Sequence, residues 1–242
     1  MASIEELEKK IKELEKRVQA LEDIEEIKNL QKTYGYYLEH WMADEIVDLF
    51  SDSPEAAVII ARGKFKGKEG IRRWFYWGLN KEEALKLRTL NPYFLHQVMQ
   101  LSGVVHLDPD GNRAKGRWYG FGPVAIPTPS GRLKAGFMNG IYECEYIKEN
   151  GKWKILKMHW YKRFLAPFNS WVEPEKRTEP TEGMVLDPNI YKPDERGEER
   201  NLYPSAFVPP FHYRHPVTNK EVQTPNIEFD RDKYRWYYQV WF

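Results

Sequence analysis

The stretch TYGYYLEHW, residues 33–41, concentrates side chains that could do chemistry. Tyr34, Tyr37 and Trp41 are spaced so that a helix would place all three on one face. A buried tyrosine hydroxyl needs a partner, and it can donate a proton to a leaving oxygen. A carboxylate such as Glu39, placed near a histidine, raises the basicity of the imidazole. Together these groups are what elimination from an alcohol requires.

The same residues also fit a plainer interpretation. Large aromatic side chains are common in hydrophobic cores, so Tyr34, Tyr37 and Trp41 could be core residues. Glu39 could then be a solvated residue at the end of a helix. Residue types and spacing alone leave both interpretations open.

The element that would carry this stretch is a long helix. Apolar residues recur in steps of three and four over residues 4–21, with charged residues between them, which is the heptad pattern of a coiled coil. Its β-branched and leucine positions favour a parallel dimer in isolated peptides. The alternative is an amphipathic helix that lies on its own domain. The helical pattern continues to residue 40, and a second helix is expected over 43–50.

Downstream, the pattern changes from helical to extended. A short hairpin is expected over 56–67, followed by a helix rich in aromatic residues over 68–79. Asp-Gly and Asn-Gly pairs then mark turns between alternating segments. The expected long strands cover 95–107, 113–126, 133–148 and 152–164. Helices followed by an antiparallel sheet predict the α+β class.

The chain is expected to have three parts. They are a heptad helix over residues 1–23, a globular domain over 24–167 and a C-terminal arm over 168–242. The arm has recurring prolines and little periodicity, yet it is rich in aromatic residues, unlike a free tail. We therefore predict an ordered, extended arm that wraps its own domain or a neighbour.

Composition narrows the functional classes. The 37 basic and 36 acidic residues give a net charge of +1, which indicates neither a nucleic-acid partner nor a polybasic membrane patch. No apolar run approaches the roughly 20 residues that span a bilayer, and the first residues do not resemble a signal peptide, so a cytoplasmic location is expected. The single cysteine, Cys144, excludes an intrachain disulfide. Aromatic residues make up 15% of the chain, which suggests an aromatic surface for a ligand or partner, with Trp118 as one candidate.

Several polar residues are further candidates for substrate binding. Gln100 alternates onto the same strand face as His96. Asn139 is a mid-strand amide, which needs a partner or a ligand when buried. His159 lies in the last strand, either in a pocket or facing outward. Arg73 or its neighbour could reach a phenolate at the mouth of a pocket.

Other reaction classes are disfavoured. The chain contains no glycine-rich phosphate loop and no G-x-S-x-G nucleophile elbow. The pair His212 and His215 has no third ligand nearby in sequence, so no metal site is predicted. An acid/base reaction without a cofactor remains.

Four features of the sequence resemble a known family by their order. They are a first helix with Tyr34 and Glu39, the segment GKEGIRRWF, a histidine that opens a strand ending in DGNRA, and the segment ENGKWKI. Over residues 24–165 they resemble the SnoaL-like branch of the nuclear-transport-factor-2-like superfamily. The resemblance implies a cone-shaped α+β fold, with N-terminal helices packed on a strongly curved, mainly antiparallel sheet around an apolar pocket.

The resemblance also implies a site. In dehydratase-like members, a tyrosine and an acidic residue on the first long helix work with a histidine on the sheet. Tyr34, Glu39 and His96 match these positions. Glu39 stands where the acidic residue is usually aspartate, so its side chain is one methylene longer.

The implied activity is that of a lyase without a cofactor. The chain resembles scytalone-dehydratase-like and bile-acid-dehydratase-like lyases, and in particular lignin-dimer γ-formaldehyde lyases, which act on diarylpropanediols. Such a reaction would lose water through a quinone methide and then formaldehyde, leaving a stilbene. His96 would transfer protons, Tyr34 would assist the departing hydroxyl, and Glu39 would orient or deprotonate.

Two other functions remain open from the sequence. One is a simple dehydratase or cyclase that acts on a hydroxylated polycyclic or phenolic substrate. The other is a module without catalysis that binds a ligand or assembles with partners. A homo-oligomer is expected. The resemblance implies a trimer and the heptads favour a dimer, and of these two the trimer is predicted.

Overall fold

The computed structural model describes the chain in several stretches. These are residues 3–89, 91, 94–127, 133–167, 192–196, 210–214, 218–219 and 221. The chain divides into two compact units, Met1–Ser205 and Ala206–Phe242. All helices and strands of the described residues belong to the first unit.

Helices precede most of the sheet in the chain. The helical elements are α1 (Ile4–Glu39), α2 (Ala43–Asp48), α3 (Gly67–Tyr76), α4 (Lys81–Ala84) and the π-helical turn η1 (Leu85–Thr89). The strands are β1 (Ala57–Ile60), β2 (Gly63–Lys66), β3 (Leu95–His96), β4 (Met99–Leu107), β5 (Arg113–Pro127), β6 (Leu133–Glu149), β7 (Lys152–Ala166) and β8 (Glu195–Arg196). Among the described residues, no helix is long and apolar enough to cross a membrane.

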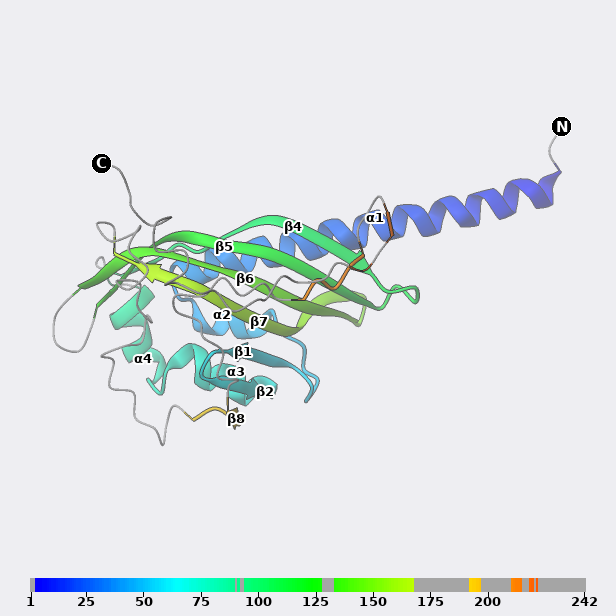
Figure 1. Ribbon diagram of the computed structural model, residues 1–242. Helices are drawn as coiled ribbons and strands as arrows, with labels where there is room; N and C mark the ends of the chain where they lie inside the picture. Colours follow the sequence, from blue (N-terminus) through cyan, green and yellow to red (C-terminus); the bar gives the residue numbers. More distant parts are fainter. Residues whose placement is uncertain are drawn as a thin grey trace, which may run out of the picture. The chain divides into compact units, whose positions relative to one another are not determined.

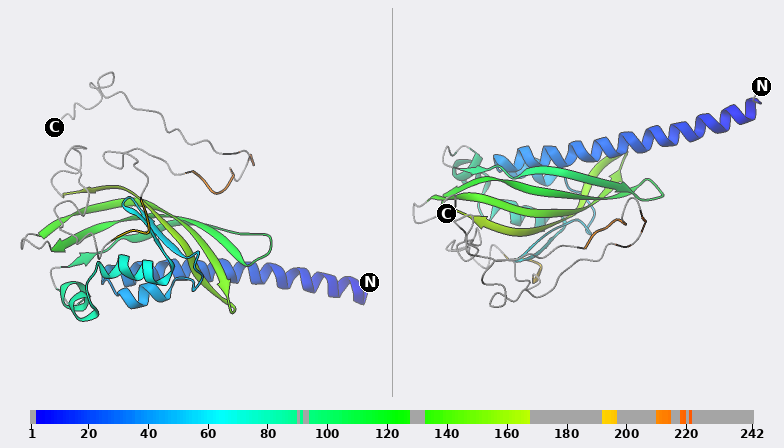
Figure 2. Two further views of the ribbon diagram at one scale, coloured as in Figure 1. Left: turned by 90° about the horizontal axis from the view of Figure 1, so that it is seen from below. Right: turned by 45° about the horizontal axis from the view of Figure 1, so that its top comes forward.

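All the strands form one curled sheet. Its order is β3-β5-β6-β7-β1-β2-β8, with β4 also paired to β5, and of the strand pairs in the described residues only β1–β7 is parallel. Long twisted strands curl as a group, and β5, β6 and β7 bend into a half-barrel under the helices (Figure 2). The predicted α+β class, with N-terminal helices on a strongly curved and mainly antiparallel sheet, is confirmed.

The expected strand over residues 95–107 is divided in two. The Gln97 N–H donates to the carbonyl of Pro123, and the Val98 N–H turns back to the carbonyl of His96 at 2.9 Å. Because of this local turn, β3 ends at His96, and the side-chain alternation of β4 does not continue that of β3. The elements α4 and η1, which precede β3, were not predicted from the sequence.

A buried chain of hydrogen bonds holds the second half of α1 on the sheet. Gln31 Nε2 donates to Gln100 Oε1 at 2.7 Å, and the Tyr146 hydroxyl donates to Gln31 Oε1 at 2.7 Å. Trp118 Nε1 donates in turn to the Tyr146 hydroxyl at 2.9 Å. Buried polar groups that satisfy one another favour one arrangement, so this chain sets the rotation of α1 and the direction in which Tyr34 points.

Residues 192–196 lie along the edge of the sheet. β8 pairs antiparallel with β2, and the Lys66 N–H donates to Asp194 Oδ2 at 2.7 Å. Arg73 Nη2 reaches Asp194 Oδ1 at 2.6 Å, and Lys66 Nζ reaches Glu195 Oε1 at 2.9 Å. These five residues of the expected C-terminal arm thus contact the domain that precedes them.

The N-terminal half of α1 extends beyond the sheet (Figure 1). A capping box begins the helix, because Ser3 Oγ accepts from the Glu6 N–H and the Glu6 carboxylate accepts from the Ser3 N–H. The apolar heptad side chains between Ile4 and Leu21 are 48–77% exposed. This half of the helix therefore does not lie on the described part of its own domain, and its apolar seam is open to another chain.

Charges beside the seam favour a second copy of this helix in parallel orientation. With Ile4 at the first heptad position, Lys10 and Arg17 occupy seventh positions. Glu15 and Glu22 occupy fifth positions. In a parallel pair these cations would face the carboxylates of the other copy, whereas an antiparallel pair would bring like charges together. We therefore propose a parallel assembly through α1.

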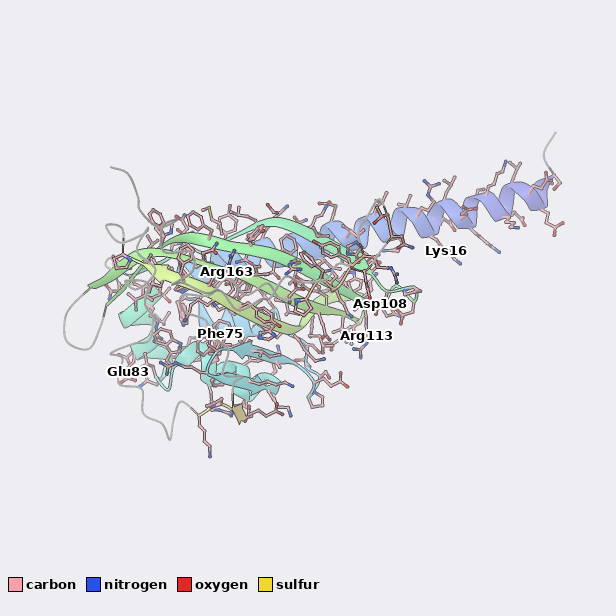
Figure 3. The ribbon with its side chains drawn as sticks, in the orientation of Figure 1. Lys16, Phe75, Glu83, Asp108, Arg113 and Arg163 are labelled. Carbon is pink, nitrogen blue, oxygen red and sulfur yellow. The ribbon has the colours of Figure 1, made fainter. Side chains whose placement is uncertain are left out.

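Leu14→Asp is expected to lower the mass of this assembly, because it places a charge in the seam. Lys16→Asp is the matched control, since Lys16 projects from the helix outside the apolar seam (Figure 3). Light scattering after size-exclusion chromatography, at micromolar concentration, measures the mass of wild type and of both variants. A monomeric wild-type protein, or equal masses for wild type and Leu14→Asp, would contradict the assembly.

Candidate active site

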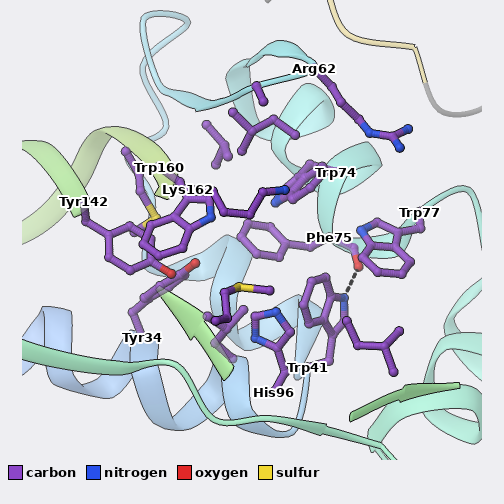
Figure 4. Close-up of a pocket in the computed structure, with 17 residues that line it drawn as sticks. Tyr34, Trp41, Arg62, Trp74, Phe75, Trp77, His96, Tyr142, Trp160 and Lys162 are labelled. Carbon is purple, nitrogen blue, oxygen red and sulfur yellow. Dashed lines mark hydrogen bonds between the residues drawn. The ribbon is translucent and has the colours of Figure 1, made fainter. Parts of the chain in front are cut away.

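A cavity lies between the concave face of the sheet and helices α1 and α3. Its wall is largely aromatic, and besides Tyr34 and His96 its rings are those of Trp41, Trp74, Phe75, Trp77, Tyr142 and Trp160 (Figure 4). The free volume is about 80 Å³, and the cavity is partly open to solvent. One water needs about 10–15 Å³ by the same measure, so the cavity has room for a group considerably larger than a single water.

Two glycines make room for the floor of this cavity. Gly120 and Gly140 face each other across β5 and β6. A Cβ on Gly140 would lie 2.4 Å from the Trp160 ring, and one on Gly120 would lie 2.6 Å from it. Trp160 can therefore lie flat against the sheet, with its ring centroid 4.1 Å from that of Tyr142.

Trp41 is held rigidly at the end of α1. Its backbone has a φ of 50°, in the left-handed region that ends a helix. Its indole N–H donates to the Phe75 carbonyl at 2.5 Å, which joins α1 to α3. Its ring meets the rings of Trp77 and His96 edge to face, each at 5.0 Å between centroids. Trp41 therefore fixes the orientation of the imidazole beside it.

His96 provides a buried imidazole in the cavity wall. Its side chain lies between Trp41 and Phe94, and the residue is 8% exposed. Nδ1 has no hydrogen-bond partner among the described residues. Burial lowers the pKa of His96 from 6.5 to about 4, and the positive charge of Arg88 acts in the same direction. The imidazole is therefore neutral near pH 7 and able to accept a proton.

Tyr34 and Tyr142 provide two phenol hydroxyls that lie next to each other in the cavity wall (Figure 4). Their rings meet edge to face at 5.9 Å. Burial raises the pKa of Tyr34 well above its ordinary value, and the Tyr142 hydroxyl raises it further. Burial also raises the pKa of Tyr142, against the effect of hydrogen bonds from Tyr34 and Gln100. Both phenols are therefore protonated near pH 7 and able to donate.

Comparison with known proteins gives the family. The model of the SnoaL-like domain matches residues 19–159, more than half of the chain. The chain belongs to the SnoaL-like family. This confirms the resemblance to the SnoaL-like family. No curated protein matches the chain.

Solved structures with a similar fold come from several bacteria. An NTF2-like protein with a cystatin-like fold from Novosphingobium aromaticivorans is 18% identical, covers 61% of this chain and 86% of its own, and has a TM-score of 0.45. A candidate scytalone dehydratase from the same organism is 15% identical, covers 60% and 87%, and has a TM-score of 0.46. A protein of unknown function from Mycobacterium tuberculosis is 17% identical, covers 69% and 82%, and has a TM-score of 0.45.

The SnoaL-like domain brings three of the sequence-predicted site residues to the cavity. Tyr34, Trp41 and His96 all line it. Glu39 is partly buried at the end of α1 and lies outside the lining. Its carboxylate accepts a long hydrogen bond, 3.4 Å, from Nε2 of Gln97, the residue after His96.

Two candidates on the helix and sheet lie behind the cavity wall. Tyr37 is partly buried against the hydrophobic core and does not line the cavity. Gln100 lies on β4 and faces α1, and its amide also donates to the Val98 carbonyl at 2.9 Å. Because it hydrogen-bonds Tyr142 as well, Gln100 contacts the phenol pair from outside the lining.

The remaining candidates lie elsewhere in the SnoaL-like domain. Trp118 belongs to the buried chain that anchors α1, and Arg73 pairs with Asp194 at the sheet edge. Asn139 and His159 occupy the strand positions next to inward-facing residues, so they point to the convex side of the sheet. There His159 stacks on Tyr161, with ring centroids 3.7 Å apart.

Among the aromatic and charged side chains that the sheet places in the lining, three were not predicted as site residues from the sequence. They are Tyr142 on β6 and Trp160 and Lys162 on β7. The signal was the alternation of β7, because Met158, Trp160 and Lys162 share one face. That alternation does not by itself say which face is concave, so the opposite row, with His159, was an equal choice.

Proposed function

We propose that this SnoaL-like protein is a lyase that removes a hydroxyl group from an aromatic alcohol by acid/base catalysis, without a cofactor. One observation carries the proposal. A neutral imidazole and two protonated phenols line the same aromatic cavity, so the site holds a base and an acid at neutral pH. The aromatic wall fits a substrate with an aromatic ring.

Each polar group has a role in this reaction. His96 accepts a proton from the substrate, and Tyr34 donates to the departing hydroxyl with Tyr142 behind it. The Tyr34 hydroxyl then regains a proton through Tyr142 or from His96. Glu39 acts at a distance, since its hydrogen bond to Gln97 helps to position the turn after His96.

The substrate class that we propose is the 1,2-diarylpropane-1,3-diols with a free para-phenol. Loss of the phenol proton to solvent and departure of the benzylic hydroxyl, which takes the Tyr34 proton and leaves as water, give a quinone methide. His96 then takes the proton of the γ-hydroxyl, the bond to the hydroxymethyl carbon breaks to release formaldehyde, and its electrons restore the phenolate. The proton on His96 returns to Tyr34, and the phenolate takes a proton from solvent. One diol thus gives one stilbene, one water and one formaldehyde.

Purified protein without added cofactor tests this proposal directly. It is incubated with the erythro and threo diols while stilbene absorbance and formaldehyde are followed in the same tube. Equal amounts of both products support the formaldehyde lyase. Loss of water alone supports the simple dehydratase, which uses the same residues. No product from either diastereomer, with folded protein that binds them, supports the binding module and contradicts the lyase.

Tyr34→Phe is expected to lower kcat by about 10²-fold, because it removes the acid that meets the leaving hydroxyl. The ring and its edge-to-face contacts remain, so KM should change little. Tyr37→Phe is the matched control, since Tyr37 lies on the same helix but outside the cavity. Steady-state kinetics compare the two variants. Equal kcat values for them would remove Tyr34 from the reaction.

A further inference from the structure

We infer that Lys162 binds the phenolate oxygen of a para-substituted phenol inside the cavity. The inference rests on the proposed function for the reaction at the other end of the ligand. It adds a binding group that fixes which end of an aromatic substrate enters first.

Lys162 is placed inside the domain by the alternation of β7. Met158, Trp160 and Lys162 face the cavity from successive inward positions. Lys162 is only 7% exposed, which is unusual for lysine because burial removes its hydration. Figure 4 shows its side chain running past Trp160 toward Trp74, on the side of the cavity away from His96.

The charges around the cavity favour an anion. The described residues that line it include two side chains that are cationic at neutral pH in water, Lys162 and Arg62. Arg62 stands at the rim, with its guanidinium directed away from the His96 end (Figure 4). His96 and the phenols are neutral near pH 7, and Lys162 places its amino group within the aromatic wall. An ammonium in such surroundings attracts a ligand anion more strongly than it would in water.

The position of Lys162 relative to His96 selects the ligand. An aromatic ring between them would present an acidic oxygen to Lys162 and its para side chain to His96 and Tyr34. A para-substituted phenol has this geometry, and the surrounding rings bury its apolar faces. A phenolate held at Lys162 supplies the electrons that expel the benzylic hydroxyl. The same oxygen receives the electrons back when the second bond breaks.

Binding of 4-nitrophenol tests the subsite without any reaction, because this probe has no leaving hydroxyl and its phenolate absorbs at a longer wavelength than its phenol. With protein in excess, wild type is expected to lower the apparent pKa of the bound probe by about one unit or more, which is about tenfold tighter binding of the anion. Lys162→Met keeps most of the side-chain volume and should abolish the shift.

Lys157→Met is the matched control. Lys157 lies on the same strand but faces the convex side, where it pairs with Glu145 at 2.9 Å. It should therefore leave the shift of the probe unchanged. If Lys162→Met does not fold, wild type alone still decides, because 4-nitroanisole cannot form an anion and should bind at least tenfold more weakly than 4-nitrophenol above the apparent pKa of the bound probe.

The possible results test the phenolate subsite and the lyase activity separately. No pKa shift in wild type, or an equal shift in Lys162→Met, overturns the subsite even if the diols are converted. A shift that depends on Lys162, together with inert diols, retains the phenolate subsite and removes the lyase. Conversion of phenolic diols but not of their O-methyl ethers, with a shift that depends on Lys162, supports both.

Discussion

His96→Ala is expected to lower kcat/KM for the aromatic alcohol substrate by about 10²–10⁴-fold, the usual contribution of one general acid or base. The imidazole is the one group of the described lining that is neutral, basic and buried among rings at pH 7. Alanine removes the proton acceptor and leaves Tyr34 with no base opposite it. Circular dichroism should show that the fold persists, because His96 lies near the end of the sheet in a two-residue strand.

The control for this variant is His159→Ala, since His159 lies on the convex side of the same sheet. Its kcat/KM should stay within about twofold of wild type, a margin set by the small effects of surface substitutions. Equal losses in His96→Ala and His159→Ala would contradict the role of His96 as the base.

The pH dependence gives an independent test of His96. A base works in its neutral form, so activity should stay level from pH 7 into the mildly acidic range and fall as the pH drops through about 4. The lowered pKa of His96 also makes the free energy of unfolding depend on pH. Between pH 6.5 and about 4 the unfolded chain binds a proton that folded His96 does not, so the free energy of unfolding decreases as the pH falls. His96→Ala should lack this contribution, and urea unfolding at several pH values measures it.

Gly122→Ala is expected to lower the free energy of unfolding by about 3 kcal/mol, at the upper end of the usual cost of overpacking. A Cβ at this position would lie 1.6 Å from the Gln97 carbonyl oxygen and 2.8 Å from its carbonyl carbon. These are backbone atoms, so relief requires movement of the turn that follows β3. That movement displaces His96, and we therefore expect activity to fall along with stability.

Gly35→Ala is the matched control for that variant. Gly35 lies in α1, and its added Cβ would lie 3.1 Å from Gln100 Cγ, a side-chain atom, and 3.9 Å from the Val98 carbonyl oxygen, an ordinary contact distance. Alanine also favours the helix over glycine by about 1 kcal/mol, so little net change is expected. Urea unfolding and steady-state kinetics compare the two variants. Equal stability for Gly122→Ala and wild type would show that β3 is free to move away from β5.

The helix period and the strand alternation let much of the molecule be predicted from sequence. The 3.6-residue period placed Tyr34 on the face of α1 that reaches the cavity. Alternation and Asp-Gly or Asn-Gly turns placed the long strands, and the SnoaL-like motif order selected His96. These features depend on residues close together in the chain or on an ordered set of motifs, so they can be recognised from the sequence alone.

What the tertiary structure decided is which of two equivalent rows faces the cavity. On β7 the row of Trp160 and Lys162 and the row of His159 have the same spacing, and only the curl of the sheet makes one of them concave. At the end of α1 the sequence period also did not decide which side chains reach the cavity. Trp41 enters the site from a left-handed position after the helix, whereas Glu39 does not line it. The sequence by itself determined most of the elements and the family, and it singled out Tyr34 and His96, which both line the cavity. The direction of each side chain depended on packing between strands and helices far apart in the chain, which no local period specifies.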